Sequence, residues 1–174
     1  QDLDLNGGLD RASFFLSEAA GFTSAAGQCA SGFQPNTDTL SGGQNLTLTI
    51  AGETLATIAL DGNGNLFTGA AVASRIQSEV RAVMDETPPG STLVGGSAAH
   101  NPLNRPAFKN FTCVYLESEE RYLLTAGVPI RFVGGAYVRD YTASTVTVGT
   151  SLTNDVATAL KLDSGAGGRV ITAG

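Results

Sequence analysis

Apolar and polar residues alternate from 46 to 50, where leucines and an isoleucine are separated by Thr47 and Thr49. A two-residue period is typical of a strand with one buried face. Residues 51–53 can close a tight turn, with Gly52 supplying a positive φ, and apolar positions resume between 55 and 60. The pattern therefore predicts a β-hairpin, although Ala56-Thr57 interrupts the alternation in its second strand.

A longer apolar period follows and predicts a helix that packs back across this hairpin. One helical stripe takes in Val72, Ile76, Val80 and Val83. Thr68 is suited to cap the start of the helix, because its hydroxyl can accept from a free backbone N–H. Pro88-Pro89 ends it, since proline cannot donate to the preceding turn. The hairpin and the helix together form the centre of the expected fold.

The second half of the chain predicts more strands and one short helix. Residues 108–117 alternate as a strand, and a charged turn at 117–121 returns the chain into a second hairpin. Residues 130–133 lead to a Gly-Gly break, and 142–148 alternate again. We expect a short helix from 152 to 162, with Asp155 favourably placed at its N-terminal dipole, and a closing strand at 169–172.

These elements predict an α+β fold, namely a mainly antiparallel sheet of hairpins with one longer and one short helix packed on one face. We expect an N-terminal extension over 1–43, with a helix between 9 and 26, and a single domain over 44–174. Residues 85–107 form a long loop rich in glycine, proline and serine. Loops of this length are uncommon in compact domains and are often functional.

The most informative feature of the composition is its low fraction of charged residues. Charged residues make up 15% of the 174 residues, against about 25% in ordinary soluble domains. Apolar residues reach 42%, which is enough for a core, and there are 22 glycines. A weakly charged surface suits a subunit that neighbours cover, and it suits equally a thermostable or secreted domain with neutral polar surfaces.

The net charge of −6 argues against binding to nucleic acid, because phosphate backbones are held by clustered lysine and arginine. No apolar segment approaches the ~20 residues that span a bilayer, so we expect no membrane span. The N-terminus lacks both an initiating methionine and a signal-peptide pattern, which is consistent with a processed terminus. Cleaved export and proteolytic maturation both fit this observation.

The two cysteines, Cys29 and Cys113, allow two interpretations. They can form a disulfide that ties the N-terminal extension to the domain, or they can be separate buried thiols. Two cysteines alone give no framework pattern, and the second interpretation is slightly favoured.

Catalytic and metal-binding patterns are weak, so we expect neither an enzyme nor a cofactor. Residues 61–65 (Asp-Gly-Asn-Gly-Asn) imitate the start of a calcium loop, but Leu66 and Val72 stand where the EF-hand pattern needs glycine and glutamate. His100 is the only histidine and has no metal or triad partners nearby in sequence. The acids at 117, 119 and 120 fit a solvated turn better than a glycosidase pair.

Four segments resemble a module of bacteriophage contractile-tail sheath proteins and related virion proteins. They are Leu-Thr-Leu-Thr-Ile-Ala-Gly-Glu-Thr (46–54), Ala-Val-Ala-Ser-Arg-Ile-Gln-Ser-Glu-Val (71–80), Phe-Thr-Cys-Val-Tyr with Tyr-Leu-Leu-Thr-Ala-Gly (111–127), and Asn-Asp-Val-Ala-Thr-Ala-Leu-Lys-Leu (154–162). The resemblance covers about 44–174 and rests on periodicity, small residues and turns. The chain departs from the family in being shorter than a complete sheath subunit, in lacking its linking arms and in adding 85–107. The resemblance implies the fold and a virion setting.

We therefore expect a non-enzymatic structural protein that self-assembles or attaches to a larger assembly, as a sheath-like, decoration, collar or fibre component of a virion. Its partners would be copies of itself or other virion proteins, and exposed strand edges would accept a neighbour's backbone. The predicted contact residues are Phe14, Phe15, Leu16, Phe22, Leu93 and Val94. A secreted or cell-surface filament subunit or adhesin is the alternative, and a carbohydrate-binding module is the third possibility.

Overall fold

The computed structural model describes residues 26–34, 38–39, 43–60, 66–86, 101–149 and 154–171. Its strands are β1 (Gln28–Ala30), β2 (Asp38–Thr39), β3 (Asn45–Ile50), β4 (Glu53–Ala59), β5 (Leu66–Phe67), β6 (Thr112–Leu116), β7 (Arg121–Thr125), β8 (Ile130–Val133), β9 (Ala136–Arg139), β10 (Val146–Gly149) and β11 (Arg169–Ile171). Its helices are α2 (Gly69–Glu86) and α3 (Arg105–Lys109), with 3₁₀ turns η1 (Pro102–Asn104) and η2 (Ser164–Ala166).

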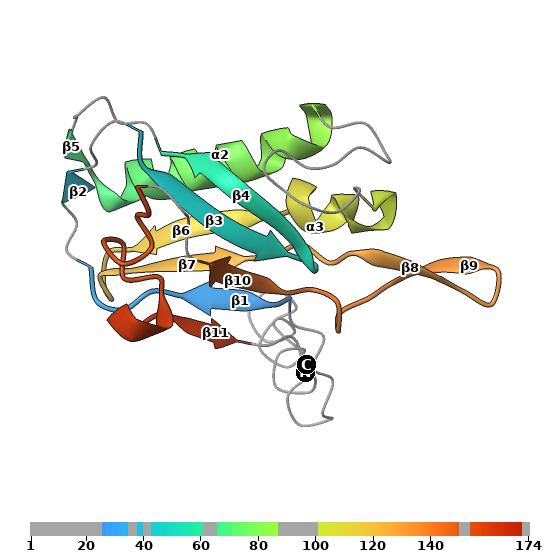
Figure 1. Ribbon diagram of the computed structural model, residues 1–174. Coiled ribbons are helices and arrows are strands. Elements are labelled where there is room, and N and C mark those ends of the chain that lie inside the picture. Colours follow the sequence, from blue (N-terminus) through green and yellow to red (C-terminus); the bar gives the residue numbers. More distant parts are fainter. Residues whose placement is uncertain are drawn as a thin grey trace, which may run out of the picture.

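Two sheets and helix α2 enclose the core (Figure 1). One sheet has the strand order β11-β1-β7-β6, and the other has the order β10-β3-β4. The described strand pairs of both sheets are antiparallel. The core combines side chains from both sheets and from α2, including the fully buried Leu48, Ile76 and Tyr122. The expected α+β fold with a mainly antiparallel sheet is therefore confirmed.

The first hairpin forms as the alternation predicts. Ala51 and Gly52 are the two turn residues between the paired Ile50 and Glu53, and both have positive φ (50° and 78°), as a type I′ turn requires. The register shifts between Leu46 and Leu48, opposite residues 55–58 of β4. This β-bulge explains the interruption at 56–57. The extra residue in β4 returns the apolar positions that follow it to the buried face of the strand.

Helix α2 is capped as expected and also covers the outer edge of β6. The hydroxyl of Thr68 accepts from the Ala71 N–H at 3.3 Å. From the middle of the helix, Gln77 accepts from the Cys113 N–H at 3.1 Å, and the Arg81 Nε donates to the Phe111 carbonyl at 2.7 Å. Side chains of α2 thus occupy backbone groups that an edge strand otherwise offers to another chain.

Residues 28–30, which the sequence analysis places in the N-terminal extension, form a strand within the four-stranded sheet. Strand β1 lies between β11 and β7 in the four-stranded sheet, and Cys29 belongs to the core. Short strands are hard to recognise when their partners are remote in sequence, and β1 pairs with residues about 95 and 140 positions away. The helix expected between 9 and 26 lies almost wholly outside the described residues.

The short helix expected at 152–162 is replaced by a single turn. The Asn45 N–H and carbonyl bind the backbones of Asn154 and Val156, which holds this stretch against β3. The turn that follows closes at once, with a Leu162 N–H to Ala157 carbonyl bond and Lys161 at φ 56°. This is the Schellman arrangement that ends helices. The described short helix is α3, at the end of the long loop, and it moves the start of the next strand from 108 to Thr112.

Candidate assembly surface

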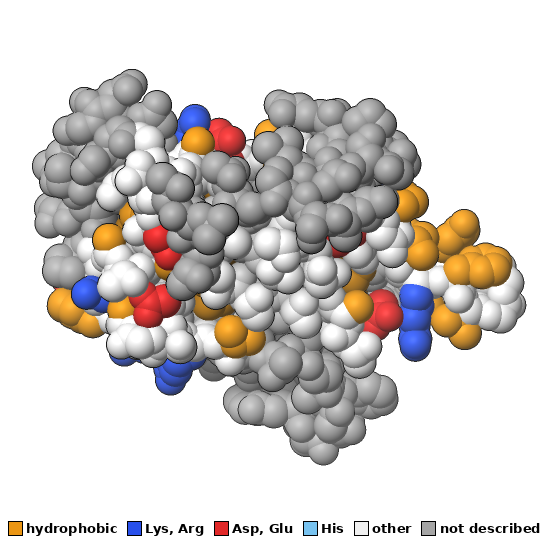
Figure 2. Space-filling view, viewed as in Figure 1, with side chains coloured by type: hydrophobic (Ala, Val, Ile, Leu, Met, Phe, Trp, Pro, Cys, Tyr) orange, Lys and Arg blue, Asp and Glu red, His pale blue; other side chains and the backbone are white. Residues whose placement is uncertain are grey.

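The most distinctive surface feature is a hairpin that projects from the body of the molecule (Figure 1). It consists of β8, the turn Gly134-Gly135 and β9, and we call residues 130–139 the arm. Every arm residue beyond Ile130 is exposed. The described residues include seven exposed large hydrophobic side chains, and four of them lie on the arm: Phe132 (58%), Val133 (51%), Tyr137 (68%) and Val138 (39%). Figure 2 shows this apolar cluster at the projecting end.

The arm is apolar on both of its faces. Phe132 pairs with Tyr137 across the ladder, and their rings lie 5.0 Å apart between centroids. Side chains of adjacent strand residues point to opposite faces, so Val133 and Val138 lie on the other side. A two-sided apolar ribbon leaves one face in water unless its surroundings enclose it. Both faces of the arm therefore expose apolar side chains, Phe132 and Tyr137 on one and Val133 and Val138 on the other.

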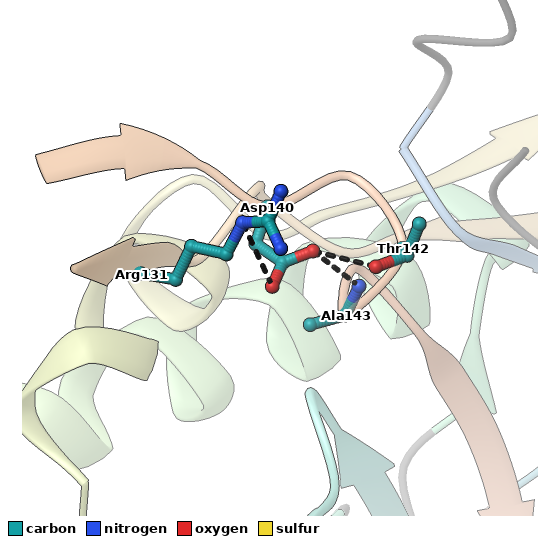
Figure 3. Close-up of polar contacts among 4 residues, drawn as sticks. All are labelled: Arg131, Asp140, Thr142 and Ala143. Carbon is teal, nitrogen blue, oxygen red and sulfur yellow. Dashed lines mark hydrogen bonds and ion pairs between the residues drawn. The ribbon is translucent and has the colours of Figure 1, made fainter. Parts of the chain in front are cut away.

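A shoulder of polar contacts fixes the arm where it leaves the body (Figure 3). Asp140 donates its N–H to the Pro129 carbonyl, and its carboxylate accepts from the Thr142 hydroxyl at 2.6 Å and the Ala143 N–H at 3.2 Å. Arg131 lies 3.8 Å from the same carboxylate. The Thr142 hydroxyl, then the Ala143 N–H and Arg131, hold the pKa of Asp140 below its ordinary value. The carboxylate therefore stays charged and keeps its partners through the neutral range.

A hollow of about 530 Å³ lies at the root of the arm. Its lining is mainly apolar and includes Ala26, Pro106, Ala126, Val128 and Ile130, with Arg139 as the charged residue among those described. Ile130 and Arg139 are the root pair of the arm and share a face with Phe132 and Tyr137. One largely apolar surface therefore runs from the hollow onto the aromatic face of the arm.

The contact residues predicted from the sequence lie outside the described part of the chain. This holds for Phe14, Phe15, Leu16, Phe22, Leu93 and Val94, and also for residues 61–65 and His100. The acidic stretch 117–120 forms the turn between β6 and β7, and Glu117 and Glu119 are exposed. The described residues contain no cluster of histidine, cysteine, aspartate and glutamate suited to a metal ion. In the same part of the chain, no helix combines the length and apolarity needed to cross a bilayer.

The two cysteines are free and buried, which decides between the two interpretations of the sequence. Cys29 on β1 and Cys113 on β6 both lie opposite Leu124 of β7, from its two sides. They are therefore two strand spacings apart, about 9–10 Å. A disulfide needs Cα atoms within about 7 Å, so this fold keeps the thiols separate. Burial raises the pKa of Cys29 to about 11, and burial followed by the nearby Cys29 raises that of Cys113 further.

Sequence reasoning missed the arm although the chain carries its signal. Gly134-Gly135 sits between two short apolar stretches, and Gly-Gly is a preferred pair for a type I′ hairpin turn. The two glycines have φ of 58° and 86°, as that turn demands. The strand β9 was overlooked because it is only four residues long and apolar on both faces, so it shows no alternation. Neither a protein-family model nor a curated protein matches this chain.

Proposed function

We propose that this chain is a non-enzymatic structural subunit of a larger assembly, a phage particle, in which the arm is a connecting element. The observation that carries the proposal is the projecting hairpin with four exposed large hydrophobic side chains. Contiguous exposed apolar surface on a protein marks a site of contact with another molecule.

The chemistry of the arm supports contact rather than catalysis. Its tip holds two rings, two valines and a Gly-Gly turn, with no nucleophile, acid or base between Phe132 and Val138 apart from the tyrosine hydroxyl. Aromatic side chains bury the largest apolar area per residue and dominate interface energetics. The shoulder at Asp140 holds the arm in place before it binds, which lowers the entropy lost on association.

Two observations favour a virion component over an exported filament subunit. The first is the resemblance of 44–174 to sheath-like modules, which covers most of the described chain. The second is the state of the cysteines, since disulfides form and persist in extracellular proteins and this fold holds the two thiols apart. The low fraction of charged residues fits a surface that neighbouring subunits cover.

Sedimentation velocity of the full chain over a range of concentrations tests the proposal, with negative-stain images of the same samples. We expect regular multimers for the wild type, and a shift to monomer for Phe132→Ser with Tyr137→Ser. Val114→Ser is the matched control, because Val114 is an exposed hydrophobic residue (42%) on β6 rather than on the arm. A wild-type chain that stays monomeric at every concentration and binds no virion protein would refute the proposed function.

A further inference from the structure

We infer that two copies of this chain join through the outer edges of their β9 strands, which pair antiparallel about a two-fold axis at Val138. The two arms then form one four-stranded sheet with the β9 strands in the middle and the β8 strands outside. This inference rests on the proposed function, because it requires copies to meet through the arm. It adds the edge, the register and the symmetry of that contact.

The arm is a two-stranded ribbon, and among the described strands none pairs with either of its outer edges. A two-stranded hairpin on its own is only marginally stable in water and gains from further strands. An open edge presents a row of backbone N–H and C=O groups, which is a template for a strand of another chain. The arm projects from the body (Figure 1), which leaves room for such a strand.

The hydrogen-bond phase of the arm shows which backbone groups are open. The Asp140 N–H donates to the Pro129 carbonyl at 2.8 Å, and along an antiparallel ladder only every second pair exchanges hydrogen bonds. The pairs that contain Tyr137 and Arg139 are therefore the non-bonded ones. The N–H and C=O of these two residues point outward from β9, and no described residue binds them.

One register of β9 against its own copy uses all of these outward groups. It places Tyr137 of each copy opposite Arg139 of the other and puts Val138 on the axis. Identical edges that pair antiparallel are related by a two-fold axis, so the contact is isologous. Opposite residues point to the same face of a sheet, so the guanidinium group of each copy meets the tyrosine ring of the other. A register centred on Arg139 would instead set two like charges directly opposite.

Charge favours the β9 edge over the β8 edge. The outward groups of β8 belong to Ile130 and Phe132, so the equivalent register there centres on Arg131. That register would place the two Arg131 side chains directly opposite each other, which is destabilising. In the sheet centred on β9, the same arginines lie on the outer strands, three strand spacings or about 14 Å apart. This separation exceeds the Debye length of about 8 Å at physiological ionic strength, so their repulsion is largely screened.

Disulfide trapping in the full chain tests the register. Opposite residues of a non-bonded antiparallel pair have Cα atoms about 4.5 Å apart, which a disulfide can bridge. We expect Val138→Cys to form a covalent two-chain species under a mild oxidant, seen on a non-reducing gel. Val133→Cys is the matched control, because Val133 is an exposed valine of the same arm (51%) but lies on β8. The control should cross-link about 10-fold more slowly or less, and the native Cys29 and Cys113 are buried.

Arg131→Cys, tested under the same conditions, reports on the β8 edge. Rapid cross-linking of Arg131→Cys, or equal rates for Val138→Cys and Val133→Cys, would overturn the inference. The same holds if Val138→Cys sediments as the wild-type multimer but does not cross-link, and this result would leave the proposed function standing. A wild-type chain that stays monomeric at every concentration and binds no virion protein would instead refute the proposed function, and the inference with it.

Discussion

Ala51 shows how a single residue can store strain in this fold. It occupies the first position of the type I′ turn between β3 and β4 with φ of 50°, a region that L residues with a Cβ avoid at about 1–2 kcal/mol. Hydrogen bonds to both of its backbone groups hold it there, since its N–H donates to the Thr145 carbonyl and its carbonyl accepts from the side-chain amide of Asn104. The turn therefore keeps its geometry against the preference of its own residue.

Replacing this alanine with the residue the turn prefers should stabilise the protein. We expect Ala51→Asn to raise the free energy of unfolding by about 1 kcal/mol, because Asn-Gly is the favoured type I′ pair. This corresponds to an increase in melting temperature of about 2–4 °C for a domain of this size. Gly52→Ala is the opposing control and should lower the melting temperature, since Gly52 has φ of 78°. An unchanged or lower melting temperature for Ala51→Asn would mean that the packing of the alanine methyl group contributes at least as much stability as relief of the turn's strain restores.

The buried thiols should make stability depend on alkaline pH. The pKa of Cys29 rises from about 9 to about 11 in the folded state. Between these values the unfolded chain has released a proton that the folded chain still holds, so stability is complete below about pH 9 and falls as the pH rises towards 11. The loss is about 3 kcal/mol, since each pKa unit corresponds to 1.36 kcal/mol. Denaturant titrations of wild type and Cys29→Ala from pH 8 to 11 check this, and parallel curves for the two would contradict it.

At the level of elements, α2 acts as a cover for a sheet edge as well as a wall of the core. Strand β6 is the last strand of its sheet, and Gln77 and Arg81 bind backbone groups on its outward side. This arrangement limits strand addition at β6, which the sequence analysis had named among the possible modes of assembly. The arm is left as the described element that reaches away from the body.

Removing one of these covering side chains should lower the free energy of unfolding, because a backbone group at the edge of the sheet loses its hydrogen-bond partner. Gln77→Ala leaves the Cys113 N–H without this acceptor, and we expect a loss of about 1–2 kcal/mol in the free energy of unfolding. Ser78→Ala is the matched control, because Ser78 is exposed and its hydroxyl bonds the Arg75 carbonyl of the same helix. The control should stay within about 0.5 kcal/mol of wild type. Equal effects of the two substitutions in chemical denaturation would argue against the covering role.

Elements were predictable where the sequence repeats a period and hidden where it does not. The hairpin at 45–59 and helix α2 follow regular apolar spacings over many residues, and both appear where expected. The bulge in β4 appears in the sequence as an interruption of the alternation. The register of β4 against β3 is needed to explain it. The turn at 156–162 has helical apolar spacing, but backbone bonds to Asn45 and a left-handed Lys161 stop it after one turn.

The whole molecule was less predictable than its parts, because its organisation depends on contacts between remote segments. The position of β1 inside the sheet is invisible in the three residues Gln-Cys-Ala themselves. The candidate assembly surface was missed for a related reason. Its hollow combines residues from Ala26 to Arg139, and only the folded chain brings them together.

The central place of β1 leads to a prediction about truncation. A chain that begins at Ala26 retains β1 and all of the described structure, so we expect it to unfold cooperatively with a melting temperature within a few degrees of the full chain. A chain that begins at residue 35 loses the strand between β7 and β11, the core residue Cys29, and the Ser31 hydroxyl that accepts from the Tyr122 N–H. Neither neighbouring strand can close this gap, so the shorter chain should lose its cooperative transition in calorimetry. A cooperative transition in the chain lacking 1–34 would mean that residues 26–34 are an appendage to the domain, as the sequence analysis expected.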